Sequence, residues 1–329
     1  MPPALEILDA GVLLTVQDGG RPGLAREGIT RGGAADRRSL AVANLLLGNP
    51  ADAAALEATL VGPRIRALRP ITIAIAGSMA DLVQGMATPV EPGTTITLAV
   101  GDVLELEARG GARGYLSVPG GIEVPLVLGS RSTALGAGFG GFEGRGLRPG
   151  DRVSAADPAR AVRPARWPGA PIPDPVDAAR PLRVVPGPHP TTLGRDAVDT
   201  LVAVAWTVSP TSDRVGIRLD GPRLSQGAAS ELPSHGVVEG TVQLPPDGRP
   251  IVLAVDHQPT GGYPVVAVVV TADLPRLGQL GPGAEVWFEM TTLGQARALL
   301  AADREAMDRA RRELAEERGT PDDTPPTQG

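Results

Sequence analysis

Glycine and proline divide the apolar parts of this sequence into short runs. The 329 residues include 43 glycines and 34 prolines, yet 42% of the residues are hydrophobic, which argues against a disordered chain. Apolar runs such as 71–77, 94–100 and 103–108 are each bounded by glycine or proline. This pattern is typical of consecutive antiparallel strands. We therefore predict a mainly β protein with a few short helices, of barrel or sandwich type.

The length and one proline-rich segment predict two domains. A chain of 329 residues can bury two separate cores. The segment 158–181 contains seven prolines, which cannot donate hydrogen bonds to a sheet or occupy a helix interior. We therefore predict an N-terminal domain over 1–157, a linker over 158–181 and a C-terminal domain over 182–291. Residues 292–329 are expected to form a terminal helix and a disordered tail.

Three segments predict helices. Asp36 is a suitable N-cap for a helix over 37–47, and Gly48 stands where a left-handed C-terminal cap is expected. The segment 50–60 is expected to continue as a second short helix or helical turn. Residues 292–318 are rich in alanine, glutamate and arginine, which predicts a solvated helix.

The absence of two residue types limits the chemistry of this chain. It contains no cysteine, which excludes disulfides, thiolate catalysis and iron–sulfur ligation by its own residues. All 31 basic residues are arginine, so a Walker-A phosphate loop, a Schiff-base lysine and a biotinyl-lysine are excluded as well. Any ATP or biotin chemistry must therefore use groups from another chain.

Charge and hydropathy exclude two further classes of partner. The net charge is −6, there is no basic block, and aromatic residues make up 2% of the chain, so we expect no nucleic acid partner. No apolar run reaches the roughly 18 to 20 residues that a membrane-spanning helix needs. The first residues lack the features of a signal peptide. We expect no membrane association and a cytoplasmic location.

Local motifs give no support for a self-contained catalytic site. There is no Gly-x-Ser-x-Gly elbow and no Ser-x-x-Lys. The glycines of 136–141 match a dinucleotide-binding string, but a turn and a strand follow instead of a helix, so a tight connection or a cleft-shaping loop is favoured. Asp36, Asn44, Asn49 and Glu57 are better explained as helix caps and turn formers than as catalysts.

The loop over residues 15–21 is the first candidate site. Gln17, Asp18 and Arg21 surround a Gly-Gly turn. The arginine can clamp a substrate carboxylate, while the other two side chains can bind an amide. An Asp–Arg pair that only braces the turn explains the pattern equally well.

Two further polar loops stand between apolar runs in the second half. Arg214 and Arg218 are four residues apart, so in an extended segment both would face one side and could reach one anionic ligand. A structural role, in which these arginines tie loops to backbone carbonyls, explains them equally well. The third loop presents Gln258, Thr260 and the Tyr263 hydroxyl, a concentration of polar groups that is typical of binding sites.

Histidine spacing argues against a metal site. His189, His235 and His257 match no local ligand motif, so we predict no metal. His235 is instead the candidate proton carrier.

Several segments together resemble one protein family. They are TVQDGGRPG, GITRGGAAD, ANLLLGNPADAAALEATLVGP, YLSVPGGIEVPLVLGSRST, GGFEGR, SDRVGIRLDGP, SHGVVEGTVQLPPDGRPIVL and TGGYPVVAVV. In this order, over about residues 15–288, they resemble the family of C-type 5-oxoprolinase subunits, also called KipA or PxpC, biotin-dependent carboxyltransferase or allophanate hydrolase subunit 2. A similar module forms part of the carboxyltransferase domain of urea amidolyase.

The resemblance implies a fold of two cyclophilin-like β-barrels and an activity that belongs to a complex. Its implied partners are a B-type subunit of the KipI or PxpB kind and an A-type subunit of the PxpA kind. The implied reaction is ATP-driven opening of 5-oxoproline to glutamate, with this chain inactive alone. The alternatives are a biotin-dependent carboxyltransferase component, with biotin on another chain and a urea-like substrate, or a non-catalytic regulatory binding protein of the KipA type.

The resemblance also places shared polar positions on this chain. Chemistry and location, not the resemblance, divide these positions into roles. The catalytic candidates are His235, Asp18 and Tyr263. The substrate-binding candidates are Gln17, Arg21, Arg214, Arg218, Gln243, Gln258 and Thr260. Ile217 stands where the family usually has an aromatic residue and Pro259 where it has a small hydroxyl residue, which leaves the substrate open.

Overall fold

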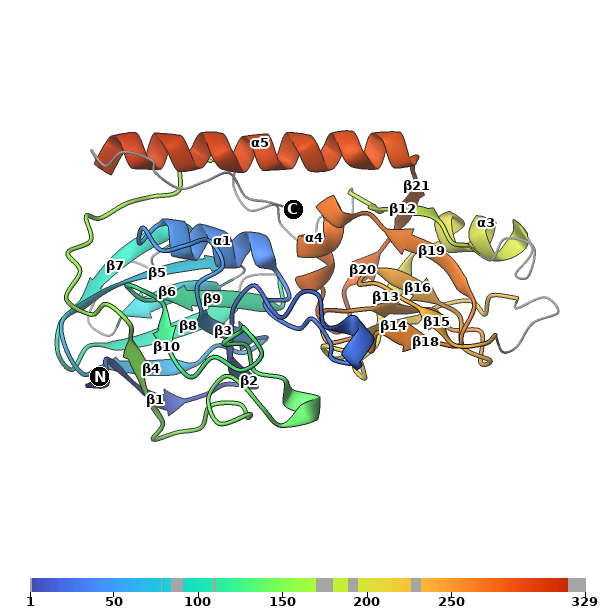
Figure 1. The fold of residues 1–329 in the computed structure, drawn as a ribbon. Coiled ribbons are helices and arrows are strands. Elements are labelled where there is room, and N and C mark those ends of the chain that lie inside the picture. The colour runs from blue at the N-terminus through green and yellow to red at the C-terminus, as the bar shows by residue number, and fades with distance from the viewer. Residues whose placement is uncertain are drawn as a thin grey trace. The chain divides into compact units, whose positions relative to one another are not determined.

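The computed structural model describes residues 2–77, 79–83, 91–108, 111–169, 180–188, 195–225 and 232–318. They form mainly strands with a few helices, as predicted (Figure 1). The chain divides into two compact units. The N-terminal unit comprises Met1–Arg21, Asp36–Asp174 and Ala302–Gly329, and the C-terminal unit comprises Pro22–Ala35 and Pro175–Ala301. The boundaries predicted from the sequence, 1–157, 158–181 and 182–291, stay a prediction.

The N-terminal unit contains two antiparallel sheets. One has the order β10-β11-β1-β4-β8-β6 and the other the order β2-β3-β9-β5-β7. Their strands are β1 (Leu5–Asp9), β2 (Leu13–Gln17), β3 (Ala55–Thr59), β4 (Arg64–Ala67), β5 (Ile71–Gly77), β6 (Met79–Val83), β7 (Thr94–Leu98), β8 (Val103–Ala108), β9 (Arg113–Ser117), β10 (Ile122–Glu123) and β11 (Arg152–Ala155). The strands predicted between residues 71 and 106 are confirmed by β5 to β8.

The central strand β3 corrects one prediction. Residues 50–60 were expected to be helical, but Ala55–Thr59 pairs with β2 on one side and β9 on the other. Its alanines, leucine and glutamate are good helix formers, yet Leu56 and Ala58 are buried in the apolar core of the unit. Tertiary pairing has overridden the local helix propensity.

The first helix follows the sequence signals closely. Helix α1 spans Arg37–Leu45, and the Asp36 carboxylate accepts a hydrogen bond from the Ser39 amide at 2.9 Å, which confirms the predicted N-cap. The helix ends two residues earlier than predicted. Gly48 adopts the expected left-handed conformation at φ 69.

The C-terminal unit is organised around one large sheet and a small hairpin. The large sheet has the order β20-β13-β14-β17-β16-β19-β12-β21, and β15 pairs with β18. The strands are β12 (Leu182–Pro186), β13 (Trp206–Val208), β14 (Gly216–Asp220), β15 (His235–Gly236), β16 (Thr241–Gln243), β17 (Ile251–Leu253), β18 (Thr260–Gly261), β19 (Val265–Val269), β20 (Glu285–Val286) and β21 (Phe288–Met290). Trp206 lies fully buried in its core and donates to the Leu201 carbonyl.

Helices α3 (Arg195–Ala203) and α4 (Leu274–Gly278) belong to this unit, and the sequence patterns did not predict either. Short 3-10 turns occur at η1 (Ala25–Glu27), η2 (Leu135–Ala137) and η3 (Thr271–Asp273). Helix α5 (Leu293–Arg318) confirms the predicted terminal helix. The predicted tail after residue 318 and residues 170–179 of the predicted linker lie outside the described residues.

Polar contacts connect the C-terminal part of α5 to α1 within the N-terminal unit. Arg318 donates to the Leu45 carbonyl at 2.9 Å and also to the Leu46 carbonyl, at the C-terminal end of α1. Arg38 and Asp303 form an ion pair at 2.6 Å. A cation at the C-terminal end of a helix is favoured by the helix dipole, so the Arg318 contacts stabilise the C-terminal ends of both helices.

Candidate functional site

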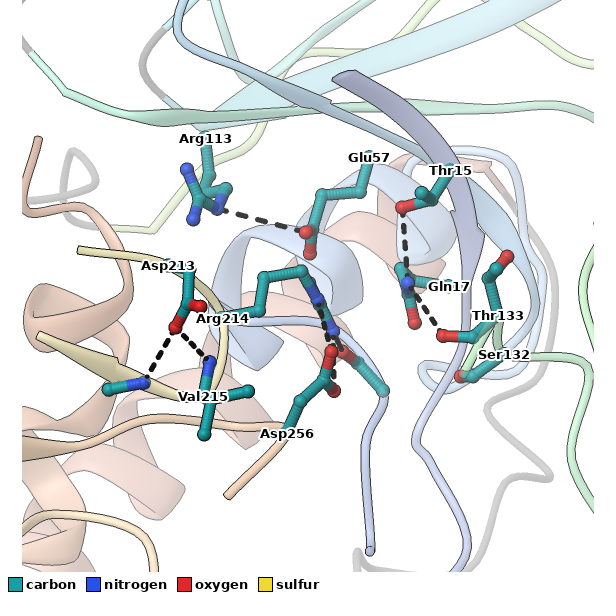
Figure 2. Close-up of polar contacts among 12 residues, drawn as sticks. Thr15, Gln17, Glu57, Arg113, Ser132, Thr133, Asp213, Arg214, Val215 and Asp256 are labelled. Atoms are coloured by element: carbon teal, nitrogen blue, oxygen red, sulfur yellow. Dashed lines mark hydrogen bonds and ion pairs between the residues drawn. The ribbon is translucent and has the colours of Figure 1, made fainter. Parts of the chain in front are cut away.

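A row of buried polar side chains crosses the five-stranded sheet of the N-terminal unit. Thr15, Glu57 and Tyr115 are neighbours in register on β2, β3 and β9, and none is more than 1% exposed. The Tyr115 hydroxyl donates to Glu57 at 2.7 Å and accepts from the Asp36 amide at 2.8 Å. Arg113 lies 3.7 Å from the other Glu57 oxygen (Figure 2). Burial and the neighbouring Glu57 carboxylate raise the pKa of Tyr115 well above its usual value.

Gln17 lies at the end of this row of polar side chains, beside Thr15, and its side-chain oxygen lacks a hydrogen-bond donor among the described residues. Its side chain is fully buried, and Nε2 donates to Thr15 Oγ1 at 3.1 Å and to the Thr133 carbonyl at 3.3 Å (Figure 2). Oε1 receives no hydrogen bond from any residue that the structure describes. A buried acceptor without a donor is unfavourable, so this oxygen is suited to accept an N–H from a ligand.

Asp18 is saturated by hydrogen-bond donors. One carboxylate oxygen accepts from the Gly20 amide at 2.8 Å and from the hydroxyls of Ser130 and Ser132, and the other accepts from the Arg131 amide. The residue is 9% exposed. A carboxylate whose oxygens already accept four hydrogen bonds has few lone pairs left to contact a ligand. The geometry therefore favours an anchoring role over the predicted catalytic one.

The Arg21 side chain contacts the same part of the chain as Asp18, around residues 127–132. It is 2% exposed, donates to the Val127 carbonyl at 3.0 Å and to the Ser132 carbonyl, and lies 4.9 Å from the centre of the Phe139 ring. We call residues 124–140 the anchored loop. Its glycine-rich end forms the tight connection expected from the sequence, closed by a bridge between Ala134 and Phe139.

In the C-terminal unit, Arg214 and Arg218 lie in different surroundings. Strand β14 begins only at Gly216, so Arg214 precedes the extended segment on which the prediction depended. Arg214 is 6% exposed, while Arg218 is exposed on the strand. Arg214 makes a bidentate contact with Asp256 at 2.8 and 3.1 Å and donates to the Gly33 carbonyl at 2.6 Å (Figure 2). The two guanidinium groups thus differ in burial and in partners, and the prediction that both face one ligand stays a prediction.

The backbone before β14 explains this difference. Asp213 accepts from the amides of Val215 and Gly216 at 2.8 and 3.0 Å, which forms a tight turn at the residue before Arg214 (Figure 2). Side chains of aspartate commonly form such turns with the backbone two residues ahead. The turn ends the alternation of faces that a strand would impose.

The hairpin of β15 and β18 gathers several predicted residues. His235 pairs with Gly261, and Gly236 pairs with Thr260. Gln243 of the large sheet is 3% exposed, and a Cβ built on Gly261 would lie 2.4 Å from its Nε2. That nitrogen donates to no residue that the structure describes. Gly261 thus leaves the space that the Gln243 amide occupies beside the hairpin.

The remaining predicted residues are more exposed. Thr260 and Gln258 are exposed, and Tyr263 is 39% exposed. His235 is half-buried, with Nδ1 3.2 Å from the Pro233 carbonyl. A half-buried histidine, an amide donor that meets no acceptor in the described structure and an exposed hydroxyl are suited to bind and protonate a small polar ligand.

Sequence reasoning missed residues that support the site rather than line it. Tyr115, Ser130, Ser132 and Thr133 were not singled out, and Glu57 was interpreted as a turn former although it lies in β3. The signal for Glu57 was its place between apolar residues in a short segment bounded by turns. Among the described residues, no three His, Asp or Glu side chains lie close enough to hold a metal ion; His189 lies outside that part of the chain. None of the described helices is long and apolar enough to span a membrane.

Comparison with known proteins identifies the family to which this fold belongs. Residues 27–290 match the model of the carboxyltransferase domain, subdomains A and B. The chain belongs to this family. It is 37% identical to the C-type subunit of 5-oxoprolinase from Escherichia coli strain K12 over 305 residues, which cover 89% of this chain and 93% of that protein.

Two solved structures are similar as well. The crystal structure of TTHA0988 matches with a TM-score of 0.77 at 37% identity, over 87% of this chain and 56% of that chain. The structure of Kluyveromyces lactis urea amidolyase matches with a TM-score of 0.82 at 29% identity, over 94% of this chain and 20% of that chain. This module therefore spans only part of each of those longer chains. The likeness confirms the fold class expected from the sequence, a mainly β chain of two cyclophilin-like β-barrel domains.

Proposed function

We propose that this chain is the C-type subunit of an ATP-dependent 5-oxoprolinase, which converts 5-oxoproline to glutamate. The observation that supports this most strongly is the 37% identity to a 5-oxoprolinase subunit of that type over 93% of its length. The partners in this proposal are a B-type subunit of the KipI or PxpB kind and an A-type subunit of the PxpA kind. The cytoplasmic location stays a prediction.

The chemistry of the reaction agrees with the composition of the chain. A lactam amide is inert, and phosphorylation of its oxygen would activate the ring carbon for attack by water. The C–N bond would then break, with the nitrogen leaving as an amine that takes up a proton, and hydrolysis of the resulting acyl phosphate would release phosphate and glutamate. This chain has no lysine and no cysteine, so it lacks the usual groups for holding ATP phosphates or forming a covalent intermediate. We therefore propose that ATP is bound with the help of another subunit and that this chain is inactive alone.

The site residues fall into two groups in this proposal. His235, Gln243 and Thr260 form the ligand-binding part of the C-terminal unit, because the Gln243 Nε2 is buried without an acceptor in the described structure. The Gln243 amide would donate to a carbonyl oxygen, and His235 would move a proton. Gln258, Tyr263 and Arg218 would complete the binding of a polar substrate.

The second group holds loops in place. Asp18 and Arg21 fix the anchored loop, and Arg214 fixes the segment that contains Gly33. Gln17 is the exception in its region, since its Oε1 is suited to accept a substrate N–H. This division differs from the sequence prediction, in which Asp18 is a catalytic candidate and Arg21 and Arg214 are substrate-binding candidates.

Reconstitution tests the proposed function. The purified chain is mixed with its A- and B-type subunits, ATP and 5-oxoproline, and glutamate is measured. We expect ATP-dependent glutamate formation only when all three proteins are present. A verified complex that forms no glutamate would contradict the proposal.

A biotin-dependent carboxyltransferase is the second candidate. It is favoured by the description of the matching family and by the TM-score of 0.82 to urea amidolyase. In that case biotin would be carried by another chain, and urea or a related amide would be carboxylated. Urea-dependent consumption of carboxybiotin, without turnover of 5-oxoproline, would support this candidate. Partner binding without turnover of either substrate would support a regulatory protein of the KipA type.

A further inference from the structure

The two units share a short sequence element that contains a buried glutamine. Residues 15–22 read TVQDGGRP, and residues 241–250 read TVQLPPDGRP. In both elements the threonine, the valine and the glutamine are buried at the end of a strand. In both, the aspartate that follows accepts a hydrogen bond from the backbone amide two residues ahead. The recurrence indicates that Gln17 and Gln243 are counterparts in the two units.

The amide of Gln17 is held in one orientation. Its Nε2 donates to Thr15 Oγ1 at 3.1 Å and to the Thr133 carbonyl at 3.3 Å (Figure 2). A carbonyl oxygen can only accept a hydrogen bond, so the amide group that faces Thr133 must be the nitrogen. The reversed amide would place two acceptors against each other. Both amide hydrogens are therefore used, and Oε1 is the atom that receives no hydrogen bond from the described residues.

The Thr133 carbonyl is fixed by its own contacts. The Thr133 amide and hydroxyl both donate to the Val16 carbonyl, at 2.9 and 3.0 Å. Thr133 is fully buried, and Gly141 packs so closely against it that an added Cβ would lie 1.9 Å from Thr133 Oγ1. The glycine-rich segment thus helps to hold an acceptor beside the Gln17 nitrogen.

The C-terminal unit lacks this orienting arrangement. Thr241 Oγ1 accepts from the Val238 amide at 3.2 Å, whereas the corresponding Thr15 accepts from the glutamine. Gln243 Nε2 donates to none of the described residues. The two counterpart amides therefore offer opposite groups to a ligand, a donor in Gln243 and an acceptor in Gln17.

A buried acceptor selects a ligand that carries an N–H. Gln17 is fully buried, so a methylene or an oxygen of a ligand placed against Oε1 would leave this atom without a donor. Sites built to hydrogen-bond an N–H reject analogues that lack it much more strongly than apolar pockets reject an extra methylene. Glu57, the carboxylate in the same row, already has Tyr115 and Arg113 as partners, so the site does not require a cationic ligand. A lactam or a carboxamide offers an N–H without a charge to bury.

These contacts assign a selective role to one residue and a positioning role to two others. Resting on the proposed function for the choice of substrate, we propose that Gln17 selects the substrate by its lactam N–H. Thr15 and the Thr133 carbonyl are the positioning groups, because together they keep Oε1 as the open atom of the amide.

The test measures the binding of two ligands to the purified full chain, without ATP, by calorimetry. The ligands are 5-oxoproline and its carbocyclic analogue, in which a methylene replaces the ring N–H. We expect wild type to prefer the lactam by about 10-fold or more. Gln17→Met keeps the side-chain volume and should bring the two affinities within about 2-fold of each other.

Thr15→Val tests the positioning role, because it keeps the shape of the side chain and removes the hydroxyl that orients Gln17. The preference for the lactam should fall by about 3-fold or more, the factor expected for one hydrogen bond. Thr241→Val is the matched control, since its hydroxyl contacts the Val238 amide. In this control the preference should stay within about 2-fold of wild type. A preference that Thr15→Val leaves unchanged, or that both threonine variants lose equally, would overturn the positioning role.

The remaining outcomes separate this site from the proposed function. Equal binding of both ligands by wild type, the result if Oε1 meets only a water molecule, would overturn the selection by N–H. Absence of binding, or a preference that persists in Gln17→Met, would overturn it as well. A chain that prefers the lactam while its verified complex forms no glutamate would contradict the proposed function alone. Glutamate formation by a complex whose chain shows no preference would contradict the role of Gln17 alone.

Discussion

The loop around Asp18 and the segment with Gln258 and Thr260, which the fold pairs with His235, were both predicted to bind a ligand. They differ in hydrogen bonding. Around Asp18 each carboxylate oxygen is engaged by donors of the same unit. Beside the hairpin, the Gln243 amide nitrogen is buried and donates to none of the described residues. Saturated groups hold structure, whereas unsaturated buried groups are available to a ligand.

Removing the Asp18 carboxylate should have the largest effect on stability. In Asp18→Ala, the Ser130 and Ser132 hydroxyls and the Arg131 amide lose their acceptor. We expect a loss of about 3 kcal/mol or more in the free energy of unfolding, since each unsatisfied buried donor costs about 1–3 kcal/mol. Urea denaturation measures this loss. The control Asp9→Ala removes one exposed turn contact and should change stability by about 0.5 kcal/mol. A loss no larger in Asp18→Ala than in the control would refute the anchoring role.

Tyr115→Phe should have the next largest effect. It removes the hydroxyl that joins Glu57 to the Asp36 amide, and we expect a loss of about 1–3 kcal/mol. Thermal or urea unfolding at neutral pH checks this value. Unchanged stability would mean that the buried row does not hold the start of α1.

Tyr115 also makes the free energy of unfolding depend on pH. The pKa of Tyr115 is raised in the folded state, so the unfolded chain releases this proton first as the pH rises. The contribution of Tyr115 to the free energy of unfolding is fully present below about pH 10, the usual pKa of tyrosine. Above that pH, the contribution falls by up to about 1.4 kcal/mol per pH unit. Wild type should therefore lose stability more steeply than Tyr115→Phe above about pH 10. Parallel pH profiles of the two proteins would contradict the burial of a neutral tyrosine.

Gly261→Ala should disturb the hairpin more than the fold. A Cβ there would lie 2.4 Å from the Gln243 Nε2, and a flexible side chain can move away. We expect a loss of about 1 kcal/mol in stability and a fall of about 10-fold in turnover by the assembled complex. Gly236→Ala is the matched control on the paired strand, because a Cβ added there would meet no atom within 4 Å. Equal turnover by the two variants would show that Gly261 and Gln243 are not part of the site.

The fold could be predicted from the sequence where local signals agree with tertiary contacts. The Asp36 cap, the Gly48 conformation and the strands β5 to β8 follow from residue type and spacing. Strand β3 could not be predicted, because its helix-forming residues are held in a sheet by partners far away along the chain. Helix propensity is a property of the segment by itself, whereas strand pairing depends on the strands that lie beside the segment in the fold.

The candidate site was predictable as a set of residues but not as a set of roles. Sequence placed Gln17, Asp18 and Arg21 in one polar loop, and they do lie in one region of the N-terminal unit. Their partners, however, are carbonyls and hydroxyls of residues 127–133, in a distant part of the chain. Whether a polar group is saturated depends on those distant partners, so spacing alone could not separate anchors from ligand-binding groups.

Gln243→Met provides the most direct test of this separation, because it removes an amide that makes no hydrogen bond through Nε2 in the described structure and keeps the side-chain volume. The measurement is the turnover of 5-oxoproline by the assembled complex, per mole of folded chain, together with the free energy of unfolding of the variant. We predict stability within about 1 kcal/mol of wild type and turnover lower by about 10-fold or more. A variant that loses stability by more than this while its turnover is unchanged would contradict the account.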